Sequence, residues 1–120
     1  MRAHGIDIVE ISRIGEALDS WGARFLRRIY TDGELEYCQG RVPALAARFA
    51  AKEAVMKALG MGNIGISWRD IEILPDNHDA PLVHLHGRAE ARARELGIKG
   101  FAISISHSRE YAIASVIGGD

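Results

Sequence analysis

The segment RFAAKEAVMKALG, residues 48–60, constrains the fold most, because it is built from strong helix formers and ends at a glycine suited to a helix C-terminus. Arg48, Lys52, Glu53 and Lys57 interrupt its apolar residues. The pairs Arg48–Lys52 and Glu53–Lys57 are each spaced i,i+4, so they form two adjoining stripes. The ordinary interpretation is a solvated face with ion pairs, and the alternative is a carboxylate placed among cations to hold a ligand.

Further elements follow one another on both sides of this helix without a long linker. Apolar alternation predicts the strands, Thr31 and Glu34 form a capping box, and Pro43 suits a first helical turn. Ser12 is the expected cap of the first helix, whose middle is weakened by Gly22. We expect strands at 6–11, within 66–74, and at 82–86, 101–106 and 111–117, and helices at 12–30, 31–39, 43–60 and 88–96. This order predicts an α+β fold with a mostly antiparallel sheet, in a single domain spanning residues 1–120.

Composition argues against several classes of function. The net charge of −1 gives no reason to expect a nucleic-acid partner. No apolar run approaches the roughly 18 residues of a membrane helix, and the N-terminus lacks the apolar region of a signal peptide. The one cysteine, Cys38, excludes an internal disulfide and fits a reducing compartment. We therefore expect a cytoplasmic protein that binds neither nucleic acid nor membrane.

Two local patterns carry little functional weight. GMGNIG at residues 60–65 matches a dinucleotide fingerprint, but a helix precedes it and a strand follows it, which inverts the required order. It is better interpreted as a helix-to-strand turn, although its N–H groups could face an anion. His84 and His86 share one strand face and could begin a zinc site. Because a zinc site requires further Cys or His ligands at suitable spacing, we interpret both as surface histidines.

Asp7 is an unusual carboxylate, because it lies inside the apolar strand sequence GIDIVEI. Ile6 and Ile8 share one face of this strand, while Asp7 and Val9 share the other. A buried aspartate must be paired, hydrogen-bonded or bound to a metal. Asp7 could accept backbone N–H groups where the next helix starts, or it could ligate Mg²⁺ with Glu53 and leave the other positions to substrate phosphates and water.

Three segments together resemble the signature of the 4′-phosphopantetheinyl transferases. They are GIDIVEISRI from residue 5, RFAAKEAVMKALG from residue 48 and SISHSREYA from residue 104. The resemblance is closest to the short bacterial holo-[acyl-carrier-protein] synthase type and spans nearly the whole chain. It implies transfer of the 4′-phosphopantetheine arm of coenzyme A to a serine of an apo acyl carrier protein, with release of adenosine 3′,5′-bisphosphate. A catalytically idle module on the same fold, which binds coenzyme A or associates with itself, is the alternative.

The resemblance also implies roles for individual residues. Asp7 and Glu53 match the family's Mg²⁺ ligands, Lys57 matches a diphosphate contact, and His107 completes the expected catalytic set. The expected coenzyme A contacts are Arg48, Lys57, Gly60, Pro81, Ser106 and His107. Glu53, a metal-bound water or His107 could each take the serine proton, and of these we favour the water.

The resemblance also implies an oligomeric state and a docking surface for the carrier protein. It generally forms homotrimers with active sites shared between neighbouring chains. It docks its acidic carrier protein on the first long helix, where this chain has Arg13, Arg24, Arg27 and Arg28. One departure is Asp79-Ala80-Pro81 where the family usually has Gly-Lys-Pro, and Arg41 or Arg88 could replace the missing lysine.

Overall fold

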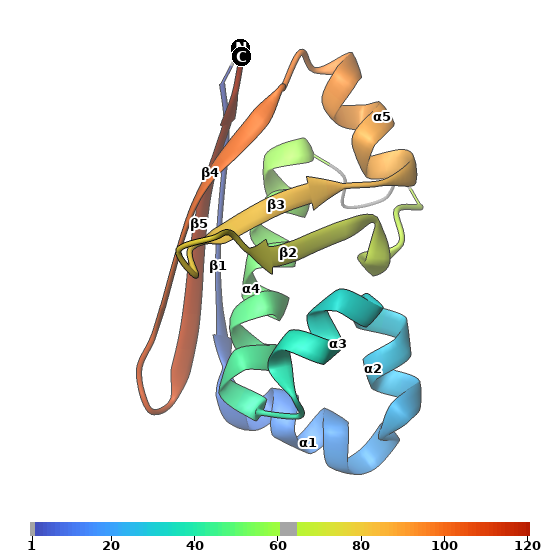
Figure 1. Cartoon of the computed structure of the whole chain (residues 1–120), viewed down its shortest axis with the longest axis vertical. Helices are drawn as coiled ribbons and strands as arrows, with labels where there is room; N and C mark the ends of the chain where they lie inside the picture. The colour runs from blue at the N-terminus through green and yellow to red at the C-terminus, as the bar shows by residue number, and fades with distance from the viewer. Residues whose placement is uncertain (1, 61–64) are drawn as a thin grey trace.

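The structure, a computed structural model, describes residues 2–60 and 65–120 (Figure 1). Its strands are β1 (Ala3–Glu10), β2 (Ile71–Pro75), β3 (Pro81–Leu85), β4 (Gly100–His107) and β5 (Tyr111–Gly119). Its helices are α1 (Ile11–Trp21), α2 (Ala23–Ile29), α3 (Asp32–Cys38), α4 (Val42–Leu59) and α5 (Gly87–Glu95), with a 3₁₀ turn, η1, at Trp68–Asp70. Within these described residues, no helix is both long and apolar enough to cross a membrane.

The strands form two antiparallel sheets, which confirms the α+β prediction. One sheet has the order β1-β5-β4, and the other is the hairpin β2-β3. Helix α4 packs against the larger sheet and also meets the hairpin, so its apolar residues join Ile71, Ile73, Ala114 and Val116 in one core (Figure 1). The predicted hairpin at the C-terminal end is confirmed as β4 and β5, which pair from Gly100–Gly119 to His107–Ala112.

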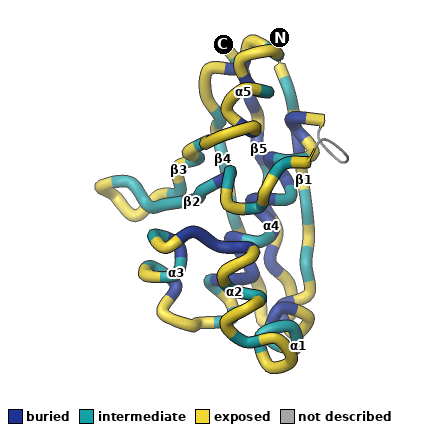
Figure 2. The backbone as a smooth tube through the Cα atoms, turned by 90° about the vertical axis from the view of Figure 1, so that its right-hand side faces the viewer, coloured by how far each residue is buried: buried dark blue, intermediate teal, exposed yellow. Residues whose placement is uncertain are grey.

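Helix α4 is buried around most of its circumference (Figure 2). Arg48 and Lys52 are among its buried residues, and only Lys57 of its three cations is exposed. For Arg48 and Lys52, the interpretation as a solvated face is therefore wrong. Because a buried charge requires a partner, each of these side chains must be explained by the contacts it makes.

The expected single helix at 12–30 is two helices, because Gly22 breaks it. Gly22 has φ 53° and ψ −130°, a conformation outside the helical region that glycine adopts without a Cβ clash. The expected Ser12 cap is also wrong. The N-cap position of α1 is Glu10, which makes no side-chain cap bond, and the N–H of Ile11 donates instead to the carbonyl of Glu110, at 2.8 Å.

The strand expected within residues 66–74 is β2, which begins at Ile71. Directly before it, residues 68–70 form η1, because Ser67 and Asp70 make a capping box that turns the chain. The capping box predicted at Thr31 and Glu34 is confirmed and starts α3. The Glu34 carboxylate of this cap also accepts from the N–H of Ile73 at 2.8 Å, which ties α3 to β2.

Candidate active site

Asp7 lies on the face of β1 that meets α4. Its Oδ1 accepts from the ammonium of Lys57 at 3.2 Å, and the same ammonium donates to the carbonyl of Ile6 at 2.9 Å. The Asp7 side chain is 17% exposed and that of Lys57 54%. Asp7 thus pairs with a cation of α4, and the alternative in which it accepts backbone N–H groups at the start of α1 is not what the structure shows.

Glu53 supplies a second carboxylate beside this pair. It is half-buried, and burial raises its pKa, the charge of Asp7 raises it further, and Lys57 opposes the rise. The carboxylates of Asp7 and Glu53 are therefore close enough to influence each other, and the one ammonium beside them, that of Lys57, pairs with Asp7. A divalent cation would relieve this excess of negative charge, and carboxylate oxygens are the ligands that Mg²⁺ prefers. The pair fits such an ion, with substrate oxygens and water filling the other positions.

A second cluster surrounds a surface hollow of about 460 Å³ at the other end of α4. Arg48, Pro81 and His107, three of the expected coenzyme A contacts, all line it. Their segments are distant in the sequence, and they meet because β4 ends beside the start of α4. Arg41 and Asp79, which the sequence singled out around the missing lysine, line it too, together with residues that sequence reasoning did not place there: Tyr37, Pro43, Ala44, Ala47 and Ile105.

Arg48 is the buried cation of this hollow. Its guanidinium carbon lies 4.2 Å from the centre of the Tyr37 ring, a stacking contact. Arg48 is only 8% exposed, and within residues 2–60 and 65–120 its Nε has no hydrogen-bond partner. Buried donors are almost always satisfied in folded proteins, so this N–H is suited to an acceptor oxygen of a ligand.

Arg41 is the better placed of the two arginines considered as replacements for the missing lysine. It lines the hollow, and its guanidinium donates to the carbonyls of Cys38 and Tyr37 at 2.9 and 2.8 Å. Arg88 lies elsewhere, beside Gly65, where a Cβ would come within 2.8 Å of its Nη1. No sequence signal pairs Tyr37 or Arg41 with Arg48, because their contact depends on how α3 and α4 pack.

Three expected contacts, Lys57, Gly60 and Ser106, lie apart from this hollow. Ser106 is exposed on the opposite face of β4 from Ile105 and His107, because side chains alternate along a strand. Gly60 is the left-handed C-cap of α4, with φ 66°, and residues 61–64 of the glycine-rich segment lie outside the described residues. Arg48 and Lys57 are nine positions apart on α4, or about 13 Å at the helical rise.

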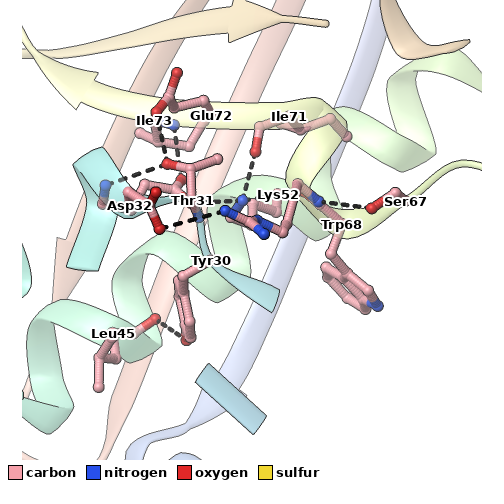
Figure 3. Close-up of polar contacts among 12 residues, drawn as sticks. Tyr30, Thr31, Asp32, Leu45, Lys52, Ser67, Trp68, Ile71, Glu72 and Ile73 are labelled. Carbon is pink, nitrogen blue, oxygen red and sulfur yellow. Dashed lines mark hydrogen bonds and ion pairs between the residues drawn. The ribbon is translucent and has the colours of Figure 1, made fainter. Parts of the chain in front are cut away.

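Lys52 does not face solvent, and among the contacts of residues 2–60 and 65–120 it makes no bond to Glu53. It is fully buried and pairs with the equally buried Glu34 of α3 at 2.7 Å. Its ammonium also donates to the carbonyls of Trp68 and Ile71 (Figure 3). Lys52 therefore belongs to the packing of α4 against α3 and β2 rather than to the surface of the site.

The histidines of β3 and its end are surface groups, as expected. His84 is exposed, and His86 pairs through Nε2 with Glu72 at 3.0 Å. In the described part of the chain, no three His, Cys, Asp or Glu side chains are grouped as a metal site. A magnesium ion at Asp7 and Glu53 would thus depend on ligands from its substrate.

The four arginines predicted for the partner surface are all exposed. Arg13 lies on α1, whereas Arg24, Arg27 and Arg28 lie on α2, beyond the break at Gly22. Arg24 and Arg28 line a shallow hollow with Trp21 and Phe25, and Trp21 is 61% exposed. This surface combines cations with an exposed aromatic side chain, which suits a partner that is both acidic and apolar.

Sequence comparison shows many close relatives. The family model of the 4′-phosphopantetheinyl transferase superfamily matches residues 3–116. The chain is 53% identical over 116 residues to a holo-[acyl-carrier-protein] synthase of Dehalococcoides mccartyi, with 97% of each chain covered. It is 47% identical over 125 residues to that of Herpetosiphon aurantiacus, with 98% of each covered.

Solved structures agree. A Helicobacter pylori holo-[acyl-carrier-protein] synthase in complex with coenzyme A superposes with a TM-score of 0.87 and 36% identity, covering 97% of this chain and 99% of that one. A Bacillus anthracis synthase in complex with coenzyme A (3′,5′-ADP) has a TM-score of 0.78 and 34% identity, covering 97% and 94%. Matched along nearly its whole length by sequence and by fold, this chain belongs to the 4′-phosphopantetheinyl transferase superfamily.

Proposed function

We propose that this enzyme transfers the 4′-phosphopantetheine group of coenzyme A to a serine of an apo acyl carrier protein. The observation that carries the proposal is the meeting of Asp7, Glu53 and Lys57 where β1 crosses α4. The hollow around Arg48 and His107 supports it, because its cations suit a nucleotide phosphate. The products are holo carrier protein and adenosine 3′,5′-bisphosphate.

The chemistry asks for positioning and charge neutralisation. The serine hydroxyl gives up its proton to a base, for which we favour a water held at the magnesium site, and its oxygen forms a bond to the phosphorus that carries the pantetheine arm. The diphosphate P–O bond to the nucleotide breaks, and the bisphosphate leaves. Mg²⁺ held by Asp7 and Glu53 would polarise that phosphorus and offset the negative charge of the diphosphate. Lys57 is half exposed, so its ammonium can donate to a diphosphate oxygen, and Arg48 offers its free Nε to the nucleotide end.

Mass spectrometry tests this function directly. The protein, Mg²⁺, coenzyme A and an apo carrier protein are mixed, and the carrier is expected to gain about 340 Da, the phosphopantetheine mass expected of group transfer to a nucleophile. The gain should require both coenzyme A and Mg²⁺. A folded protein that binds coenzyme A yet leaves the carrier unmodified would contradict the transferase proposal.

We place the docking of the carrier on the surface formed by Trp21, Arg24, Phe25 and Arg28. Replacing Arg24 and Arg28 by Ala is expected to raise KM for the carrier about tenfold. The difference from wild type should grow as the salt concentration is lowered, because exposed charges steer association. The KM for coenzyme A should stay unchanged. Arg94→Ala on α5, 79% exposed, is the matched control and should behave as wild type. An unchanged KM for the carrier in the double variant would move the docking surface elsewhere.

We also propose a homotrimer, built on the face of the larger sheet that α4 does not cover. This face exposes large apolar side chains, which in a soluble protein usually mark an interface. They are Ile6, Ile8, Tyr111, Ile113 and Ile117. Ile8 and Ile113 lie opposite each other across β1 and β5. In sedimentation, Ile8→Glu should yield the 13.1 kDa monomer whereas the wild type sediments as a larger species, and a monomeric wild type would contradict the assembly.

A cytoplasmic location completes the proposal. The supporting observation is Cys38, whose thiol is fully buried among apolar residues. Burial raises its pKa, which keeps the thiol protonated and unreactive. A chain with this single, protected thiol is suited to a reducing compartment.

A further inference from the structure

A buried polar network joins α3, α4 and β2 (Figure 3). At its centre Lys52 and Glu34 are both fully buried and form an ion pair at 2.7 Å. The Lys52 ammonium uses its other two protons on the carbonyls of Trp68 and Ile71. The Glu34 carboxylate accepts from the backbone N–H groups of Thr31 and Ile73 at 2.9 and 2.8 Å. Every donor of the ammonium therefore has a partner.

The network extends from this pair toward the surface. Thr31 donates its hydroxyl to Glu72 at 2.5 Å, and the other oxygen of Glu72 pairs with His86 at 3.0 Å. The same Thr31 hydroxyl accepts from the N–H of Glu34 at 3.2 Å and so caps α3. One connected set of bonds thus ties α3 and α4 to the β2–β3 hairpin and to the start of α5.

Stability alone is a weak reason for such a pair. Taking two charges out of water is costly, and a buried ion pair often stabilises a fold no better than apolar side chains of the same volume. What the pair does provide is a single allowed arrangement, because the ammonium must meet two carbonyls and a carboxylate at once. It fixes both the rotation of α4 about its axis and the position of α3 against it.

Both helices present active-site residues next to the pair. On α4, Lys52 directly precedes Glu53 and lies one turn after Arg48. On α3, Glu34 lies one turn before Tyr37, whose ring stacks on the Arg48 guanidinium at 4.2 Å. A rotation or slide of either helix would change the direction of Glu53 and separate Tyr37 from Arg48.

We propose that Lys52 and Glu34 are positioning residues for the transfer reaction, acting through the orientation of Glu53 and of the Arg48–Tyr37 stack. This rests on the proposed function. Neither residue is catalytic, because both are sealed from the hollow and from solvent. The outer branch through Thr31 controls the nucleotide end only, since it holds α3 and makes no bond to α4.

The test compares Lys52→Met with Val55→Ala. Val55 is also fully buried on α4 but lies in the apolar core and makes no bond in the network. Both variants should melt earlier than wild type. Only in Lys52→Met is kcat expected to fall, by about tenfold or more, because Glu53 is misplaced by a fraction of an ångström. The same variant should bind adenosine 3′,5′-bisphosphate more weakly in calorimetry, because the Arg48–Tyr37 stack is disturbed. Equal kinetic losses in the two variants at matched fractions folded would overturn the proposal.

A milder pair of variants covers the case in which Lys52→Met does not fold. Thr31→Val removes the hydroxyl at nearly constant shape, whereas Thr31→Ser keeps it. Thr31→Val is expected to weaken binding of the bisphosphate severalfold and raise KM for coenzyme A with kcat unchanged, while Thr31→Ser behaves as wild type. Identical binding by the two variants would overturn the positioning role. Failure of wild type itself to bind the bisphosphate would instead contradict the proposed function.

Discussion

Glu53→Gln is expected to abolish Mg²⁺-dependent transfer, with a fall in kcat of at least about 10³-fold, because loss of a charged ligand removes both the ion and the charge neutralisation it provides. The substitution keeps the shape of the side chain. The protein should therefore remain folded and should still bind adenosine 3′,5′-bisphosphate at the hollow around Arg48, which does not include Glu53. Glu36→Gln, on the exposed side of α3, is the matched control and should keep full activity.

The same substitution should stabilise the metal-free protein. Burial and the nearby Asp7 raise the pKa of Glu53, so the folded state holds the proton more tightly than the unfolded state does. For this group, stability therefore falls as the pH rises from the ordinary glutamate pKa through the raised pKa, and the loss is complete only above the raised pKa. Glutamine carries no charge at any pH, so the Glu53→Gln variant does not suffer this loss of stability. In EDTA, Glu53→Gln should melt at or above the wild-type temperature.

Added Mg²⁺ is expected to reverse the order of the two melting temperatures. A ligand that binds only the folded state raises the melting temperature, so Mg²⁺ with coenzyme A should stabilise wild type more than Glu53→Gln. Turnover at the wild-type rate by the variant would remove Glu53 from the metal site. A lower melting temperature in EDTA would show instead that the carboxylate supports the fold, contrary to the cost expected of two neighbouring carboxylates.

Sequence reasoning succeeded where a feature depends on local chemistry. The capping box at Thr31 is confirmed because its bonds span three residues, and the hairpin of β4 and β5 is confirmed because strand periodicity and a short turn are local signals. Asp7 and Val9 do share the face that meets α4, with Ile6 and Ile8 on the other, since side-chain alternation is fixed by the strand itself.

Features set by packing were not predictable in the same way. Lys52 and Lys57 lie on the same helix and have the same chemistry, yet one is fully buried and the other half exposed. What distinguishes them is the ion pair of Lys52 with Glu34, 18 residues earlier, and no local sequence pattern predicts that contact. The Arg48–Tyr37 stack is of the same kind, because it depends on how α3 and α4 meet. The break at Gly22 depends on a backbone conformation that glycine permits without requiring.

The contact between β1 and α4 at Gly5 is expected to tolerate no side chain at all. A Cβ built on Gly5 would lie 1.8 Å from the carbonyl oxygen of Ala54 and 3.0 Å from the N–H nitrogen of Ala58, both backbone atoms of α4. Backbone cannot rotate out of the way as a side chain can. Gly5→Ala must therefore push α4 away from β1, by roughly 1.5 Å, in a core packed too densely to absorb the shift.

We expect Gly5→Ala to lower the free energy of unfolding by about 3 kcal/mol or more, at the upper end of overpacking costs. Gly5 lies two residues before Asp7, and Ala54 directly follows Glu53, so the displaced helix would also separate the two carboxylates. Protein that still folds should lose activity by about 10²-fold, the cost of an ångström-scale misplacement. Urea denaturation and the carrier-modification assay measure the two effects.

Gly15→Ala is the matched control. Gly15 lies inside α1, and its added Cβ would meet only the Cγ1 of Val42, at an ordinary 3.6 Å. Alanine is the better helix former, so this variant should gain about 0.5–1 kcal/mol and keep its activity. If Gly5→Ala unfolds at the urea concentration of wild type, the close approach of β1 and α4 is wrong. The close placement of Asp7 beside Glu53 would then need another explanation, because this backbone contact is what brings the strand against the helix.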